Sequence, residues 1–231
     1  MKKFYDKASV AEVASGFSVV LDGRDIKTPA TKLLVVSSKP LAKAIANEWQ
    51  GQGEKVDLKT MPLTTLSYAA IDQVADNRAL IEGEVGAYAS SDLICYRADI
   101  PAELRKKEEA VWDPIVAWLK DKYNIDLILI TGISHVEQGH DTKEFISKYL
   151  GDCDHFALAA MQRLTGLLGS IFLSIAIDKK QITVEQAWAA SRVDEIYQAE
   201  LWGEDTESLG EIEAKYAHFC AASQFLSLIR T

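Results

Sequence analysis

The sequence predicts an α+β protein with a small β-rich N-terminal domain, residues 1–60, and a larger, mainly helical C-terminal domain, residues 61–231. Strand-like runs and a turn signal fill the first forty residues, whereas helical periodicity dominates the chain after about residue 60. The 231 residues suffice for one large or two small domains, and the 48% hydrophobic and 26% charged residues are typical of a folded globular protein.

The N-terminal domain opens on a predicted hairpin. The runs FSVVL (17–21) and RDIKT (24–28) flank Asp22-Gly23. This dipeptide is typical of two-residue turns, because both turn positions need a positive φ. The run LLVVS (33–37) predicts one more short strand.

The rest of the chain carries mainly the 3.6-residue hydrophobic period of helices. The predicted helices cover residues 41–49, 64–90, 101–112, a further segment from 114, and residues 142–151, 154–177, 183–202 and 208–229. Pro62 is well placed at a helix start, and Thr183 to Gln186 fit a capping box. Glu108 and Glu109 lie in a charged run that is typical of a solvated helix face. The break at Asp113-Pro114 is expected because a proline inside a helix removes a hydrogen bond, whereas at a helix start it is well tolerated. The pattern leaves LICYR (93–97) open between strand and helix end. The run IDLILIT (125–131) is a candidate strand for the N-terminal sheet.

Charge, cysteine content and hydropathy exclude several classes of protein. With 25 Lys and Arg against 34 Asp and Glu, the net charge is −9, which argues against binding to nucleic acid or an anionic membrane. Three widely spaced cysteines predict a reducing compartment rather than a disulfide framework. The longest apolar run, residues 164–177, is too short to span a bilayer and predicts a buried helix. The start of the chain lacks a secretory signal, so we expect a cytoplasmic bacterial protein, or a mitochondrial matrix protein if the chain is processed.

No catalytic constellation emerges from the sequence, and we therefore predict no catalytic residue, no metal and no cofactor. The chain lacks a phosphate-binding glycine loop, a Gly-x-Ser-x-Gly motif and a His-Glu-x-x-His motif. Among the four histidines, His155 and Cys153 come nearest to a metal-binding pair, but a zinc site needs three or four ligands with recurrent spacing. This pattern favours a binding role over catalysis.

One candidate contact surface lies in the predicted helix 183–202. Trp188, Glu195 and Trp202 are spaced by seven residues and would project from one side of a continuous helix. Core packing explains the tryptophans equally well, and Glu195 could simply pair with Arg192. Alternatively, tryptophans beside a carboxylate are typical of a surface that binds another protein.

Six segments together resemble the assembly chaperone of the ATP synthase catalytic head, the member that handles the alpha subunit. They are LDGRDIKTPA (21–30), LAKAIANEWQGQG (41–53), MPLT (61–64), SDLICYRA (91–98), WDPIVAW (112–118) and EIYQAELWGED (195–205). The resemblance runs in order over nearly the whole chain. It implies a β-rich N-terminal part, a helical C-terminal part, no cofactor and no catalysis. It also implies that the chain binds the unassembled alpha subunit and prevents its aggregation, and we expect it to do so as a monomer.

The resemblance also indicates which residues bind the partner. In the family an acidic residue just before the YQ-x-x-x-WG segment is functionally important. It corresponds to Glu195 here, with Asp194 as the alternative. Trp188, Trp202 and Trp112 complete the predicted partner-binding set, although core packing accounts for Trp112 as well.

Two alternatives remain open at this point. The first is a small cytosolic hydrolase or transferase that uses Glu and His residues in a cleft between the two domains. The second is a constitutive structural subunit of a larger complex. The first requires titratable groups that converge in space, and the second requires retention of the chain in the mature assembly.

Overall fold

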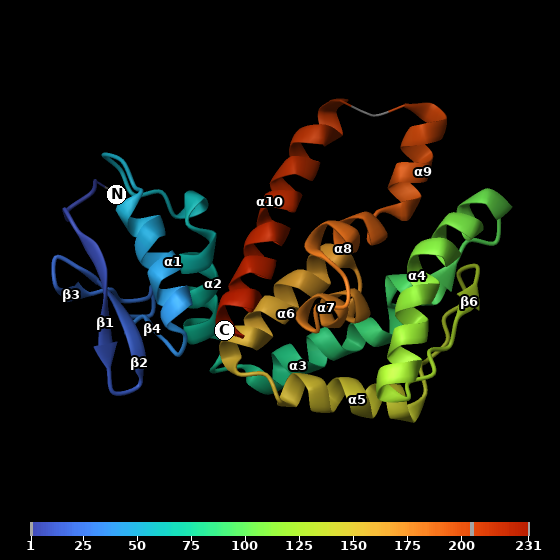
Figure 1. Cartoon of the computed structure of the whole chain (residues 1–231), viewed down its shortest axis with the longest axis horizontal. Coiled ribbons are helices and arrows are strands. Elements are labelled where there is room, and N and C mark those ends of the chain that lie inside the picture. The colour runs from blue at the N-terminus through green and yellow to red at the C-terminus, as the bar shows by residue number, and fades with distance from the viewer. Residues whose placement is uncertain (1, 204–205, 231) are drawn as a thin grey trace. The chain divides into compact units, whose positions relative to one another are not determined.

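The computed structural model describes residues 2–203 and 206–230, apart from the side chains of residues 206–209 (Figure 1). Contacts group the chain into two compact units, and each unit combines segments that are distant in sequence. Unit 1 contains Met1–Ile81, Cys153–Ala160 and Cys220–Thr231, and unit 2 contains Glu82–Asp152 and Met161–Phe219. These units differ from the predicted domains 1–60 and 61–231. Residues 61–81, 153–160 and 220–231 join the unit that carries the N-terminal sheet. The predicted α+β class is confirmed.

Unit 1 combines a small antiparallel sheet with helices. Its elements that lie wholly within it are β1 (Ala8–Val13), β2 (Gly16–Leu21), β3 (Arg24–Asp25), β4 (Val35–Val36), α1 (Lys39–Gln50), a 3-10 turn (Leu58–Thr60), α2 (Pro62–Ala69) and a π-helical turn (Ala70–Val74). In the sheet, β2 pairs with β1, β3 and β4. In Figure 1 the strands lie on one side of α1 and α2 lies on the other.

The predicted hairpin forms, but the sheet differs from the prediction in two ways. Asp22 and Gly23 take positive φ values of 48° and 80°, as a two-residue turn requires. The strand β1 was missed, although it pairs with β2 along its whole length. The predicted strands 24–28 and 33–37 shrink to two residues each, because the turn through Pro29 and Thr31 leaves only an isolated bridge between them.

Polar side chains fix the start of both long helices of unit 1. The hydroxyl of Ser38 accepts a hydrogen bond from the backbone N–H of Leu41 and so caps α1. The carboxylate of Glu48 accepts bonds of 2.8 Å from the backbone N–H groups of Leu63 and Thr64 at the start of α2. The MPLT motif is therefore a capped helix start, and Pro62 occupies the first helical position as predicted.

Unit 2 is helical with one very small sheet. The elements that lie wholly within it are a 3-10 pair (Tyr88–Ser91 and Leu93–Cys95), β5 (Tyr96–Arg97), α4 (Ala102–Tyr123), β6 (Ile130–Thr131), α5 (His140–Gly151), α7 (Ile171–Asp178), α8 (Val184–Ala190) and α9 (Val193–Trp202). The helices α3 (Arg78–Ala87), α6 (His155–Leu168) and α10 (Thr206–Ile229) divide their residues between the two units. The open segment 93–97 is thus part 3-10 turn and part strand.

The expectation that residues 125–131 join the N-terminal sheet is wrong. Only Ile130–Thr131 form a strand, and they pair in parallel with β5 in a separate two-stranded sheet. Earlier in the run, the side-chain amide of Gln138 takes the place of a partner strand, because it both donates to and accepts from the backbone of Ile128. These local partners satisfy the backbone without the N-terminal sheet.

The predicted helix break at Asp113-Pro114 is also wrong, because α4 continues through Pro114. The side of α4 that carries Trp112, Ile115 and Leu119 is buried, whereas Pro114 is exposed. Burial of the apolar side outweighs the loss of one backbone hydrogen bond on the solvent side. Asp113 does not cap a helix but forms an ion pair with Arg97.

Three predicted long helices are each divided in two. Residues 64–90 form α2 and α3 with the π-helical turn between them, and 154–177 form α6 and α7, separated at Gly169, whose φ is +65°. Residues 183–202 form α8 and α9, which are separated by Ser191 and Arg192. Within the described ranges, no helix is both long and apolar enough to cross a membrane.

A candidate partner-binding surface on helix α9

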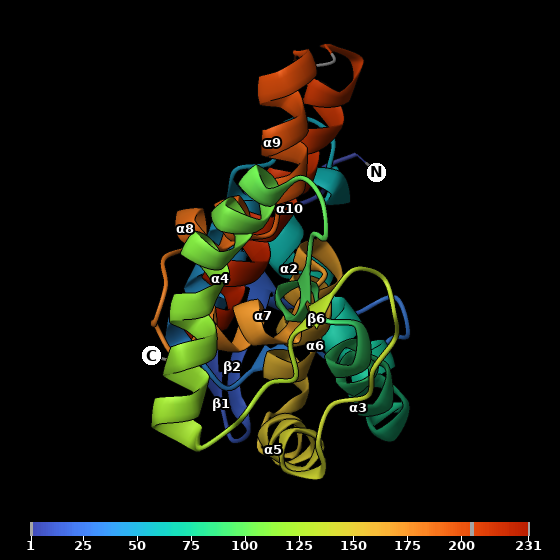
Figure 2. The same cartoon turned by 90° about the vertical axis from the view of Figure 1, so that its right-hand side faces the viewer.

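The helix α9 is reached through a well-defined turn. Thr183 and Gln186 form the predicted capping box at the start of α8. After Ser191 the chain changes direction and α9 begins at Val193, whose side chain is buried. In both views α9 leads away from α8, past the N-terminal part of α4 (Figure 1 and Figure 2).

One side of α9 is attached to α4 by charged side chains. The ammonium of Lys107 lies 2.5 Å from Oε2 of Glu200 and 5.8 Å from the ring centre of Tyr197. Asp194 lies one turn before Tyr197 on α9 and faces Glu108 of α4. The side chain of Glu108 is buried. These contacts hold the helix from behind, and we call this the inner side of α9.

The carboxyl group of Glu108 is tuned by its surroundings. Burial raises its pKa, and the neighbouring Asp194 carboxylate raises it further, whereas the backbone N–H of Ala98, which donates to Glu108 at 2.7 Å, lowers it. In the described part of the chain, Oδ1 of Asp194 is buried and accepts no hydrogen bond from a fixed donor. A proton retained on Glu108 would supply that donor, because the two carboxyl groups repel each other when both are ionised.

A buried arginine organises the residues beneath this pair. The guanidinium of Arg97 donates to Oδ1 of Asp113 at 2.8 Å and to the backbone carbonyl of Ile94, and it lies 4.9 Å from the ring of Trp112. The indole N–H of Trp112 in turn donates to the carbonyl of Ala190 at 2.8 Å. The segments DLICYRA and WDPIVAW therefore meet in one network, which attaches α4 to the end of α8.

The opposite side of α9 has little to cover it. Ile196 is 43% exposed and Trp202 is 79% exposed. Glu195, in the first turn of α9, is exposed as well. Glu195 and Trp202 are seven residues apart, so they project from the same side of this helix. Gly203 ends the helix with a φ of 85°. We call Glu195, Ile196 and Trp202 the outer side of α9.

The remaining predicted residues lie elsewhere. Trp188 belongs to α8, so the interpretation of Trp188, Glu195 and Trp202 as one helical stripe is wrong. The ring of Trp188 is half-buried, 5.3 Å from the rings of both Tyr216 and Phe219, with the guanidinium of Arg192 5.4 Å from it. Arg192 and Glu195 form no ion pair in the described part of the chain, so the structure does not support the alternative that they pair.

Of the predicted set, the structure therefore brings together Asp194, Glu195 and Trp202, but on two sides of one helix. Trp112 is only 1% exposed and supports α8 from within the core. Sequence reasoning missed Glu108, which was assigned to a solvated charged run. Its spacing of four from both Leu104 and Trp112 on the buried side of α4 was the available signal.

His135 and His140 are exposed and so do not form the enclosed site that a hydrolase or transferase requires. The carboxylates described near His140 belong to its own helix, Asp141 at 3.9 Å and Glu144 at 3.7 Å. Among the residues that the structure describes, no three His, Cys, Asp or Glu side chains are grouped so as to hold a metal ion. The geometry instead presents an apolar and acidic surface on a helix whose other side contacts α4.

Comparison with known proteins identifies the family. The family model of the ATP12 chaperone protein matches residues 2–120. The protein atp12, mitochondrial, of Schizosaccharomyces pombe is 25% identical over 225 residues, which cover 90% of this chain and 77% of that protein. The crystal structure of Atp12 from Paracoccus denitrificans is 32% identical with a TM-score of 0.95, and the match covers 99% of this chain and 98% of that one.

Two further solved structures are similar. An aspartate-to-lysine mutant of the Paracoccus denitrificans protein has a TM-score of 0.95 at 31% identity and covers 99% of this chain and 98% of that one. A protein from Agrobacterium tumefaciens has a TM-score of 0.94 at 35% identity and covers 98% of this chain and 85% of that one. The chain therefore belongs to the ATP12 chaperone family, whose role is in the assembly of ATP synthase.

Proposed function

We propose that this chain binds the unassembled alpha subunit of ATP synthase and prevents its aggregation, and that the outer side of α9 is a principal contact. One observation carries this proposal: Trp202 is 79% exposed at the end of a helix that is fixed from behind by α4. A large indole left in water is unfavourable unless a partner covers it. Membership of a chaperone family also implies a non-enzymatic role.

The chemistry of this surface suits a temporary complex. A subunit awaiting its neighbours exposes apolar and charged patches that drive aggregation. Trp202 offers an aromatic anchor of the kind that dominates binding energy, and Glu195 offers a carboxylate that can pair with an arginine of the partner. Because the outer side is small, the complex can hold the subunit and still release it to its proper neighbour in the assembled enzyme.

The rigidity of the inner side has a role in the same proposal. The contacts of Lys107 with Glu200 and of Glu108 with Asp194 hold α9 before the partner arrives. A preordered helix loses less conformational entropy on binding than a mobile one. Asp194 thus acts by positioning α9, whereas Glu195 touches the partner.

The experiment compares two charge reversals. Wild-type protein is expected to suppress light scattering by refolding alpha subunit without ATP, and Glu195→Lys should reduce this suppression and the co-purification of alpha subunit at least tenfold. Glu109→Lys is the matched control, because it makes the same charge change on the exposed side of α4. Equal loss in both variants would show a general charge effect, and no loss in either would remove Glu195 from the contact. Failure of the wild-type protein to capture alpha subunit would contradict the proposal itself.

A further inference from the structure

A second surface in unit 1 has features of a binding site and involves no residue of α9. A cavity of about 570 Å³ opens between the end of the N-terminal hairpin, α1 and α2. Its apolar lining is formed by Phe4, Leu21, Ile26, Trp49, Leu58 and Tyr68. Cavities that bind ligands in proteins have this size and this predominance of apolar and aromatic walls.

The apolar lining continues onto the surface. Phe4 is 63% exposed and Leu58 is 41% exposed. Two large apolar side chains at the mouth of an apolar cavity form a patch that gains stability when another apolar surface covers it. A ligand that fills only the cavity would leave this rim in water.

Trp49 contributes apolar ring surface to the cavity wall, and we call this hollow the Trp49 cavity. Its side chain is 4% exposed, and its indole nitrogen is buried away from the open space, so the ring offers a ligand apolar contact rather than a hydrogen bond.

The charge around the cavity is positive in an otherwise acidic protein. Arg24 and Lys27 line it and form no ion pair with any described residue. The acidic Asp25 also lines it and accepts a hydrogen bond of 2.6 Å from the hydroxyl of Ser18, so the cations of the lining exceed its carboxylates by one. The two cations therefore favour a ligand that carries a carboxylate next to its apolar part.

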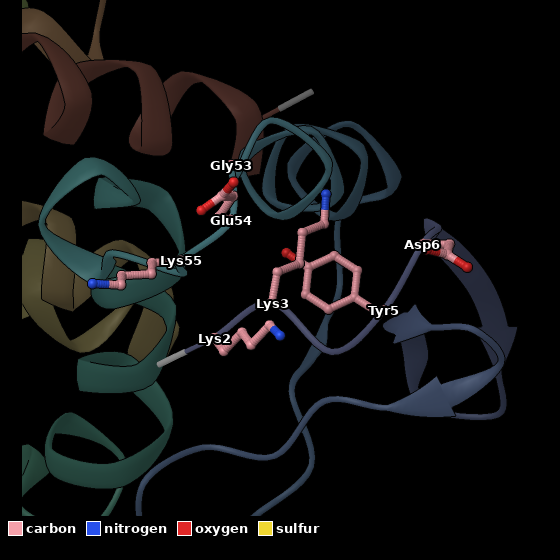
Figure 3. A pocket seen from close by; sticks show the side chains of 7 residues that line it. All are labelled: Lys2, Lys3, Tyr5, Asp6, Gly53, Glu54 and Lys55. Atoms are coloured by element: carbon pink, nitrogen blue, oxygen red, sulfur yellow. The ribbon is translucent and has the colours of Figure 1, made fainter.

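A neighbouring pocket with more lysines does not offer the same chemistry. Lys2, Lys3 and Lys55 line it (Figure 3), but the ammonium of Lys3 already donates to the backbone carbonyls of Gln50 and Gln52. Figure 3 also shows the three ammonium groups pointing in different directions. The three lysines of this pocket therefore do not form one anion site.

We propose that the Trp49 cavity binds an extended segment of the client polypeptide in which an apolar side chain is followed by an acidic one. The apolar side chain fills the cavity against the Trp49 ring, and the acidic side chain pairs with Arg24 or Lys27. The exposed rim of Phe4 and Leu58 favours a polypeptide over a small molecule, because it extends the apolar surface beyond the cavity. This proposal rests on the chaperone role but requires no contact by α9.

The test uses a fluorescein-labelled peptide of sequence Ala-Leu-Phe-Glu-Leu-Asp-Ala-amide and fluorescence anisotropy with the full chain. We expect saturable binding, weakened at least tenfold by Leu58→Asp and several-fold by Lys27→Glu.

The remaining outcomes separate this proposal from the one for α9. Trp202→Ala should bind the peptide like the wild type, because Trp202 is not part of the cavity. No saturable binding, or equal binding by wild type, Leu58→Asp and Lys27→Glu, would overturn the cavity proposal even if the wild type captures alpha subunit. Binding of dodecanoate with displacement of a weakly held peptide would show a small amphiphile as the true ligand and would also overturn it.

Discussion

Unit 2 contains two regions built from the segments that identify the family, and they differ in the burial and hydrogen bonding of their polar side chains. Around Asp92 and Arg97 the charged side chains are buried and bonded to backbone and side-chain partners. On the outer side of α9 the charged and aromatic side chains are exposed and uncovered. The contrast indicates that the first set of residues maintains the fold, whereas the second is available to a partner.

The Asp92 region illustrates the structural role. Oδ2 of Asp92 accepts from the backbone N–H groups of Ile171 at 2.7 Å and Phe172 at 3.3 Å, at the start of α7. Oδ1 accepts from the N–H of Ile94 at 3.2 Å. One side chain thus fixes the break between α6 and α7 and the 3-10 turn before β5. Burial raises the pKa of Asp92 to about 7, so its ionised form depends on these donors for stabilisation.

The largest effect is expected from Asp92→Ala. The substitution leaves three buried N–H groups without their carboxylate acceptor, two of them at the start of α7, so the free energy of unfolding should fall by about 3 kcal/mol or more. Urea denaturation followed by circular dichroism measures this. Asp99→Ala, at an exposed position in the same part of the chain, should change the free energy by less than about 0.5 kcal/mol. Similar losses in the two variants would show that the Asp92 contacts carry no special weight.

The next effect is expected on the outer side of α9. Trp202→Ala should weaken binding of alpha subunit ten- to a hundredfold, about 1.4 to 2.8 kcal/mol, because an exposed aromatic anchor is lost. The melting temperature should stay within about 1 °C, since the side chain is 79% exposed. Ile133→Ala is the control, because Ile133 is 99% exposed in the same unit. A melting temperature that falls with the affinity would instead assign Trp202 to the fold.

A smaller effect is expected on the inner side of α9, where the contribution of Glu108 to the free energy of unfolding should depend on pH. The pKa of Glu108 is raised above its ordinary value of 4.5 in the folded state. The stability that its bound proton confers is complete below 4.5 and is lost as the pH rises through the raised pKa. Glu108→Gln cannot ionise, and its amide can donate to Asp194 while its oxygen accepts from Ala98.

The measurement compares unfolding free energies of wild type and Glu108→Gln from pH 4.5 to 8. The variant should become more stable relative to the wild type as the pH rises, and Glu109→Gln should show no such trend. Other buried carboxyl groups are common to both proteins and cancel in the difference. A difference that is independent of pH, or one that falls with rising pH, would contradict the shared-proton description of Glu108 and Asp194.

The smallest effect is expected for the ion pair of Lys107 with Glu200. Both side chains are about half exposed, and such pairs contribute little. Lys107→Ala should lower the free energy of unfolding by about 0.5 kcal/mol or less. At high salt the difference between the variant and the wild type should be smaller, because salt screens the ion pair. A loss above about 2 kcal/mol in denaturant titrations would show that this pair, rather than Glu108 and Asp194, holds α9.

Periodicity in the sequence was sufficient to predict that most of the helices exist, but not to predict where they begin and end. The Asp-Gly turn, the start of α2 at Pro62 and the capping box at Thr183 were all predicted, because each depends on local backbone chemistry. The break at Gly169 was missed, because the carboxylate that stabilises the start of α7 comes from Asp92, which is remote in the sequence. Pro114 was misjudged for the complementary reason, since burial of Trp112 and Ile115 holds α4 together across it.

The candidate site was predictable only in part. The resemblance pointed to Asp194 and Glu195, but no periodicity argument could tell which of the two faces α4, because α9 begins only after Ser191 and Arg192. The pairing of Asp194 with Glu108 depends on how α4 and α9 meet in space. Long-range contacts of this kind leave only a weak pattern in a single sequence.

The most direct test of the central claim is site-specific photocross-linking to free alpha subunit. Benzoylphenylalanine placed at position 202 should form a cross-link that mass spectrometry maps to a peptide of the alpha subunit, and the same probe at position 133 should form none. Abundant cross-links from position 133 and none from position 202, in a complex that still co-purifies, would place the partner elsewhere on the chaperone.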